Sequence, residues 1–98
     1  MVKFEWNENK NKTNIARRGL DFNDAAQMFN SLLVIEIDNR INYGEDRYER
    51  LGVVNSRLMI VIYTRRAPDI VRIISYRKAN KREQTQFKKK VPNRLGTS

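Results

Sequence analysis

Four short apolar segments between residues 32 and 76 constrain the fold of this 98-residue chain most strongly. They are "LLVIEID" at 32–38, "RYERLGVV" at 47–54, "RLMIVIYT" at 57–64 and "IVRIISY" at 70–76. Each is rich in β-branched or aromatic residues and is bounded by turn-forming residues, a pattern typical of β-strands. Because "VNSR" and "RRAPD" allow tight turns, we expect sequential antiparallel pairing, with the apolar run at 58–63 in a central strand.

Helical signals lie on both sides of these segments. After a brief strand at 3–6, "NENKNKTNIARRG" ends at Gly19, which suits the left-handed position just past a helix C-terminus. "DFNDAAQMF" has apolar residues at the spacing of one helix face: Phe22, Ala25, Ala26 and Phe29. From residue 79 onward "ANKREQTQFKKK" has a helix-forming composition. The predicted fold is α+β, with two N-terminal helices packed on a mostly antiparallel sheet and a C-terminal helix.

The chain is short enough for one domain. We expect this domain to span residues 1–90, with a disordered basic tail at 91–98, because "VPNRLGTS" contains proline, glycine and mostly polar residues. In the strand at 47–54 the apolar phase shifts after Tyr48, and a bulge at Gly52 would absorb that shift.

Alternation along the last strand places side chains on its two faces. A regular strand puts Ile70, Arg72, Ile74 and Tyr76 on one face and Val71, Ile73 and Ser75 on the other. Arg72 then lies among apolar neighbours and needs an acceptor, so a paired structural role competes with a functional one. Arg77, at the strand end, is expected to be freer to face a ligand. Asn80-x-x-Glu83 resembles a capping box, which favours a structural role for Glu83.

Charge is distributed unevenly along the chain. Residues 1–64 hold nine Lys/Arg and nine Asp/Glu, whereas residues 65–98 hold eleven and two, so the second part carries the whole net charge of +9. This asymmetry predicts an acidic partner, which could be RNA, DNA or a protein; a solubilising basic tail is the alternative.

The absence of certain residues and motifs narrows the function. The chain has no cysteine and no histidine, which removes thiolate chemistry and makes a zinc site implausible, and we expect neither a metal nor a cofactor. It has neither a P-loop nor a GxGxxG motif. The longest apolar run, at 58–63, is too short to span a membrane, and the N-terminus has no signal-peptide pattern, so a cytoplasmic location is expected.

Arginine, lysine and tyrosine alternate at the strand segments. Aromatic rings that stack on bases beside guanidinium groups that bind phosphate are typical of single-stranded RNA recognition, although each such residue is also common on a strand surface. The predicted nucleic-acid-binding residues are Tyr48, Arg50, Arg65, Lys78, Lys81 and Arg82.

Four motifs together resemble a known family. They are "FEW-x-x-NK-x-x-x-NI-x-x-x-G" at 4–19, "F-x-x-AA-x-x-F" at 22–29, "GE-x-R-x-x-x-LG" at 44–52 and "RIIS-x-R-x-A-x-x-x-E" at 72–83. In this order they resemble the BrnT family of type II toxins. The resemblance implies a RelE-like fold, ribonuclease activity that inhibits translation, and a BrnA-like antitoxin encoded by a neighbouring gene, with operator DNA as a further target of the complex. It also implies functional roles for Arg47, Arg72, Arg77 and Glu83.

The chain departs from the family pattern at three positions. Arg18 stands where the family commonly has histidine, Tyr76 where it has a small residue, and Phe87 where an aromatic residue with a hydroxyl is common. A mechanism that uses that histidine cannot operate in this chain.

The predicted reaction is metal-independent cleavage of RNA by its own 2′-hydroxyl. Arginine remains charged and can only stabilise the phosphorane, so proton transfer falls to a carboxylate, a lysine or a tyrosine. The predicted catalytic residues are Arg47, Glu49, Arg72, Tyr76 and Arg77. The alternatives are a non-catalytic module that binds nucleic acid or antitoxin within a repressor complex, and an adaptor that binds a protein partner.

Overall fold

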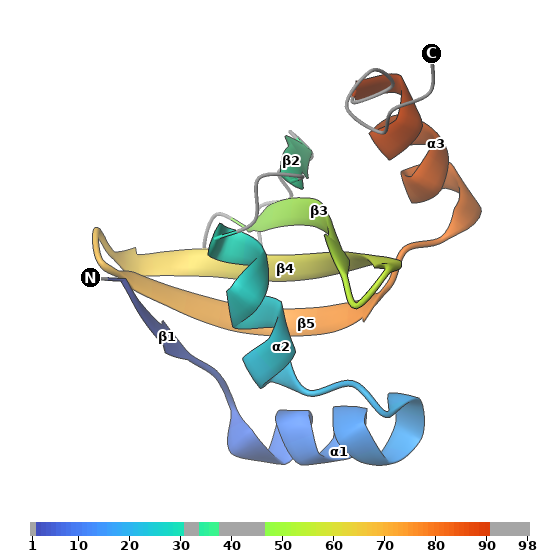
Figure 1. The fold of residues 1–98 in the computed structure, drawn as a ribbon. Coiled ribbons are helices and arrows are strands. Elements are labelled where there is room, and N and C mark those ends of the chain that lie inside the picture. Colours follow the sequence, from blue (N-terminus) through green and yellow to red (C-terminus); the bar gives the residue numbers. More distant parts are fainter. Residues whose placement is uncertain (1, 31–33, 38–46, 91–98) are drawn as a thin grey trace.

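The computed structural model describes residues 2–30, 34–37 and 47–90 of the chain (Figure 1). The elements follow the predicted order: β1 (Lys3–Glu5), α1 (Glu8–Arg18), α2 (Phe22–Ala26), the 3₁₀ helix η1 (Gln27–Asn30), β2 (Val34–Ile37), β3 (Tyr48–Val54), β4 (Arg57–Ala67), β5 (Ile70–Lys78) and α3 (Lys81–Lys90). The α+β class, the two N-terminal helices and the C-terminal helix are therefore confirmed. The predicted tail at 91–98 lies outside the described residues.

The described strands form one sheet in the order β1-β5-β4-β3-β2. The pairs from β2 to β5 are sequential and antiparallel, as predicted, and β4 is the central strand. The turn between β3 and β4 is tight because Asn55 and Ser56 both adopt positive φ, at 52° and 66°. The parallel pairing of β1 with β5, which joins Glu5 to Arg72, was not predicted.

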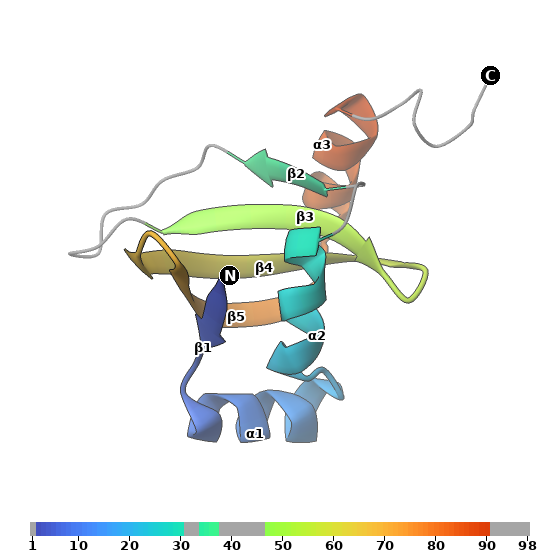
Figure 2. The same ribbon diagram turned by 60° about the vertical axis from the view of Figure 1, so that its left-hand side comes forward.

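The two faces of the sheet carry separate cores because side chains alternate along each strand. On the α2 face, α2 and η1 cover the side chains of Met59, Val61, Tyr63, Val71, Ile73 and Tyr76. On the opposite α3 face, Phe87 and Ala79 pack on Leu51 and Ile60. Figures 1 and 2 show α1 and α2 on one side of the strands and α3 beyond the far end of β5.

Two asparagines attach α1 to the rest of the fold. Asn11 is buried; its side-chain oxygen accepts from the Phe22 N–H at 2.9 Å, and its amide donates to Asp21 at 3.1 Å. Asn14 donates to the Tyr76 carbonyl at 3.0 Å, at the side of β5. Gly19, at φ 68°, ends α1 in the left-handed conformation that the sequence predicted. The start of α2 and the edge of β5 are therefore both tied to α1.

The predicted bulge at Gly52 is wrong, because β3 and β4 pair in continuous register from Tyr48 to Val54. The apolar phase shift in β3 has another cause: both of its faces contribute to a core, Val54 to the α2 face and Leu51 to the α3 face. The sequence pattern of a strand buried on both faces contains no strict alternation.

Register shifts instead lie between β4 and β5, at Ile62/Tyr63 and at Arg65/Ala67, and the first of them adds a residue to β5. Ile62 pairs with Ser75 and Tyr63 with Ile73, which leaves Ile74 as the extra residue. The predicted grouping of side chains along this strand is therefore wrong beyond Ile73. Tyr76 lies on the α2 face with Val71 and Ile73, while Arg77 is opposite Ile60 on the α3 face.

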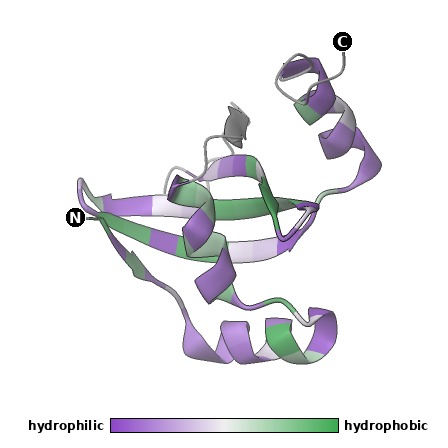
Figure 3. Cartoon of the chain, viewed as in Figure 1, coloured by the Kyte–Doolittle hydropathy of each residue, from purple (hydrophilic) through white to green (hydrophobic). Residues whose placement is uncertain are grey.

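Helix α3 is attached along a narrow line. Its buried residues are Glu83 and Phe87, and most of its other residues are exposed. Figure 3 shows α3 as largely hydrophilic, in contrast to the apolar central strands. Among the described residues, no helix is long and apolar enough to cross a membrane.

Candidate active site

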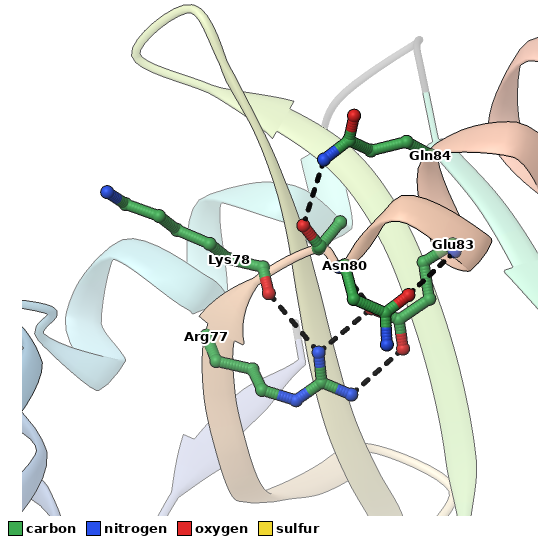
Figure 4. Close-up of polar contacts among 6 residues, drawn as sticks. Arg77, Lys78, Asn80, Glu83 and Gln84 are labelled. Carbon is green, nitrogen blue, oxygen red and sulfur yellow. Dashed lines mark hydrogen bonds and ion pairs between the residues drawn. The ribbon is translucent and has the colours of Figure 1, made fainter.

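The site is centred on an ion pair between the end of β5 and the first turn of α3 (Figure 4). The Arg77 guanidinium donates to both oxygens of Glu83, from Nη1 to Oε1 at 2.8 Å and from Nη2 to Oε2 at 2.9 Å. Nη1 also donates to the Lys78 carbonyl at 3.2 Å. A bidentate pair of this kind fixes the plane of the guanidinium as well as its position.

Glu83 is itself held by a capping box, as the sequence predicted. The Asn80 side chain accepts from the Glu83 N–H, and Oε1 of Glu83 accepts from the Asn80 N–H, both at 2.8 Å. Burial raises the pKa of Glu83, but the hydrogen bonds from Arg77 and Asn80 outweigh burial and lower it below its ordinary value. The same hydrogen bond to Glu83 raises the pKa of Arg77. Both groups are charged at neutral pH.

The expectation that Arg77 is freer to face a ligand needs correction, since three of its five N–H donors are occupied. Nη1 uses both hydrogens and Nη2 uses one. Within the described part of the chain, no hydrogen bond reaches Nε–H or the second Nη2 hydrogen. These two donors share one edge of the guanidinium plane, and the side chain is 28% exposed. One edge of Arg77 is therefore held by protein, while the other can bind an anion bidentately.

Glu49 lies on the same face of the sheet. It is opposite Ile62 on β4, which is opposite Ser75 on β5, so the three residues form a row next to the row of Leu51, Ile60 and Arg77. The charge of Glu49 contributes to the raised pKa of Arg77. The structure thus places two of the predicted catalytic residues on the same face of the sheet, in neighbouring rows and on strands separated by β4.

Arg72 also lies on the α3 face, but farther along β5. Its Nη1 donates to Oε2 of Glu5 at 3.0 Å, with the side chains 28% and 44% exposed. Glu5, on β1, is therefore the acceptor that Arg72 was predicted to need. Arg77 lies five positions beyond Arg72, about 16 Å at ordinary strand rise, which is too far for both to contact one phosphate.

Tyr76 does not lie on the α3 face. It is 1% exposed, within the core under α2, and burial raises its pKa to about 12. Its hydroxyl is therefore poorly suited to proton transfer with RNA. Phe87, another departure from the family pattern, is likewise buried, while Arg18 is exposed at the end of α1.

The predicted nucleic-acid-binding residues divide between the two faces. Tyr48 stacks on Tyr63 with ring centroids 5.5 Å apart, and the Arg50 guanidinium lies 4.3 Å from the centroid of Phe29; all four are on the α2 face. Arg50 and the exposed Arg65 border a hollow of about 640 Å³ there. This group lies on the opposite face of the sheet from Arg77.

The remaining predicted residues lie near the end of β5 and just before the start of β3. Lys78 follows Arg77, and Lys81 and Arg82 are in the first turn of α3; all three are exposed. Arg47 directly precedes β3 and is partly buried. In the part of the chain that the structure describes, no three acidic residues gather as a metal site would require.

Sequence reasoning missed Glu5 as the partner of Arg72, because 67 residues separate them. Only the parallel pairing of β1 with β5 brings them together. The motif "RIIS-x-R-x-A-x-x-x-E" contains both Arg77 and Glu83, but its spacing alone does not reveal that the two side chains meet.

The structure is that of a small basic α+β protein with an arginine–carboxylate pair at the junction of its sheet and its C-terminal helix. The family model described as "Ribonuclease toxin, BrnT, of type II toxin-antitoxin system" matches residues 6–83. The chain belongs to this family. As a type II toxin it has a cognate antitoxin and an RNA substrate.

A solved structure supports the assignment. The crystal structure of the Brucella abortus ribonuclease toxin BrnT is similar to this chain with a TM-score of 0.65 and 29% identity, covering 83% of this chain and all of the other. No curated protein matches the chain.

Proposed function

We propose that this toxin cleaves RNA by attack of the 2′-hydroxyl on the adjacent phosphate, without a metal ion, and thereby inhibits translation. The observation that carries the proposal is the geometry of Arg77. Glu83 fixes one edge of its guanidinium, and the Nε–Nη2 edge remains for two phosphate oxygens. A donor held in this way can stabilise the negative charge that develops on the phosphorane without reorganising during the reaction.

Proton transfer is assigned to Glu49 and to water. Glu49, on the same face of the sheet as Arg77, takes the proton of the 2′-hydroxyl as its oxygen attacks phosphorus, and a water molecule protonates the 5′-oxygen as the P–O bond breaks. The products are a 2′,3′-cyclic phosphate and a 5′-hydroxyl end. Glu83 positions Arg77, because its carboxylate is fully engaged by Arg77 and Asn80.

The remaining basic residues bind the RNA outside the reacting phosphate. Arg72 contacts a flanking phosphate along β5, and Arg47, Lys81 and Arg82 add attraction for the backbone. Tyr48, Arg50 and Arg65 lie on the α2 face and bind a more distant part of the RNA. Binding through such contacts weakens as salt concentration rises.

The test is cleavage of a defined RNA by purified toxin freed of antitoxin, in the presence of EDTA. We expect cyclic-phosphate and 5′-hydroxyl ends, no cleavage where the attacked nucleotide carries a 2′-deoxy sugar, and growth arrest on induction in cells. Intact RNA in both free and translation-coupled assays, together with normal growth, would contradict the proposal.

A second candidate function is a non-catalytic binding module within a toxin–antitoxin repressor complex. Two features favour this function. The chain has no histidine, and the Tyr76 hydroxyl is buried, so few side chains can transfer a proton. RNA that is bound but never cut, with retained operator binding by the complex, would select this function.

A further inference from the structure

A groove runs beside the candidate active site, between the β3–β4 turn and α3. Its volume is about 530 Å³, and its apolar floor consists of Val53, Leu58, Ala79 and Phe87. The floor is held in place because the Ala79 N–H donates to the Leu58 carbonyl at 3.0 Å and the Gln84 side chain donates to the Ala79 carbonyl at 3.2 Å. Val53 and Leu58 are only partly buried, so apolar surface remains open in the groove.

Three cations form the rim of the groove. Arg57 comes from the turn end of β4, Lys78 from the end of β5 and Lys88 from the last turns of α3. All three are exposed. Among the residues that line the groove there is no acidic side chain. An occupant therefore needs apolar side chains for the floor and carboxylates for the rim.

These requirements favour a peptide segment over RNA. The one aromatic ring in the floor belongs to Phe87, which is 3% exposed and offers no open face on which a base can stack. The chain's own last eight residues, "VPNRLGTS", contain Arg94 and no acidic side chain, so their charge does not complement the rim.

We infer that this groove binds an acidic amphipathic segment of the cognate antitoxin. This inference rests on the proposed toxin function, because the antitoxin is chosen as the occupant only if the protein is a toxin. Lys78 and Ala79 line the groove and directly follow Arg77 in the chain, so a segment seated in the groove lies at the end of β5 that carries Arg77. The bound segment also packs against α3. This helix carries Glu83, and its Phe87 attaches it to the sheet.

The first test places a charge in the apolar floor. Leu58→Asp is compared with Ile15→Asp, which makes the same kind of change at an exposed apolar residue of α1. We expect the affinity of the antitoxin for the toxin to fall about tenfold or more for Leu58→Asp, as for the centre of an interface, and to stay within about twofold for Ile15→Asp. Binding is measured by calorimetry with the full-length antitoxin, and thermal unfolding confirms that each variant is folded.

The second test reverses a charge on the rim without touching the floor. Lys88→Glu is compared with Lys12→Glu, an exposed lysine on α1. We expect weaker antitoxin binding for Lys88→Glu only, with a difference that shrinks as salt concentration rises. This variant keeps the inference testable if Leu58→Asp does not fold.

Cleavage of RNA by the same variants, freed of antitoxin, separates the outcomes. Unchanged antitoxin affinity in both groove variants overturns the inference, whether or not the toxin is active. Loss of RNA binding with unchanged antitoxin affinity also overturns it and makes the groove an RNA surface. If the wild-type toxin fails to cleave RNA but the groove variants still weaken antitoxin binding, the inference stands and the proposed reaction fails.

Discussion

The two faces of the sheet are built from the same strands but contain different chemistry. The α2 face buries a large apolar and aromatic cluster under α2 and η1, including Tyr63 and Tyr76. The α3 face has a small apolar cluster around Leu51, Ile60 and Phe87 and, next to it, the Arg77–Glu83 pair. One face therefore supplies most of the apolar burial, and the other holds charges in fixed positions.

This division explains how a short basic chain can keep its arginines fixed. A guanidinium is positioned by hydrogen bonds, and those bonds need a backbone that does not move. The core under α2 holds β4 and β5 rigid, and Glu83 then orients Arg77 from α3. The weak link is α3 itself, which few apolar contacts attach to the sheet.

The largest effect is expected on the α2 face. Tyr76→Ala removes a buried ring and should lower the free energy of unfolding by about 4 kcal/mol, measured by urea denaturation. Tyr76→Phe is the matched control and should retain both folding and RNA cleavage, because the buried hydroxyl takes no part in the reaction. Loss of cleavage in folded Tyr76→Phe would show that this hydroxyl takes part in the reaction and would contradict the assignment of the reaction to the α3 face.

Phe87→Ala tests how α3 is attached. It removes the main apolar contact of α3 and should lower the free energy of unfolding by about 3 kcal/mol, the lower end of the range for this change because the cluster is small. RNA cleavage should fall at temperatures where the remaining fold is intact, since Glu83 no longer holds Arg77. Equal loss of hydrogen-exchange protection in α3 and in β4 would show that the two clusters are not separable.

Glu83→Gln sharpens the electrostatic side of the comparison. Because the pKa of Glu83 in the folded chain is below its ordinary value of 4.5, its ionic contribution is fully present above about pH 4.5 and is lost as pH falls through the folded-state pKa. We expect the variant to be about 2 kcal/mol less stable than wild type at pH 7, with a difference that shrinks in acid. Urea denaturation at several pH values measures it. A difference independent of pH would mean that the carboxylate acts only through its shape.

The smallest effect is expected at the Arg72–Glu5 pair. Both side chains are partly exposed, so Glu5→Gln should change the free energy of unfolding by less than about 1 kcal/mol, measured by the same denaturation. A loss of several kcal/mol would show that this pair is a structural anchor equal to the core on the other face.

Much of the fold could be predicted from local sequence. Gly19 marked the end of α1, the apolar spacing from Phe22 marked α2, and the β-branched segments with their turns gave the antiparallel order. The Asn80–Glu83 capping box was also visible, because its residues are three positions apart and its hydrogen bonds are local.

The side-chain arrangement could not be predicted in the same way. The extra residue Ile74 moves Tyr76 to the opposite face, and no local pattern indicates it because Ile74, Ser75 and Tyr76 all suit a strand. The partners Glu5 and Arg72 depend on a parallel pairing between distant segments. The predicted RNA-binding residues likewise formed one set in the sequence, but the structure divides them between the two faces of the sheet.

The most direct test of the account is the rate of RNA cleavage by Arg77→Lys under single-turnover conditions, compared with Arg17→Lys on α1. Lysine keeps the charge but cannot bind Glu83 with one edge and phosphate with the other. We predict a rate about 100-fold to 1000-fold below wild type for Arg77→Lys and an unchanged rate for Arg17→Lys, with both variants folded. A rate for Arg77→Lys within a fewfold of wild type would contradict the central role of the Arg77–Glu83 geometry.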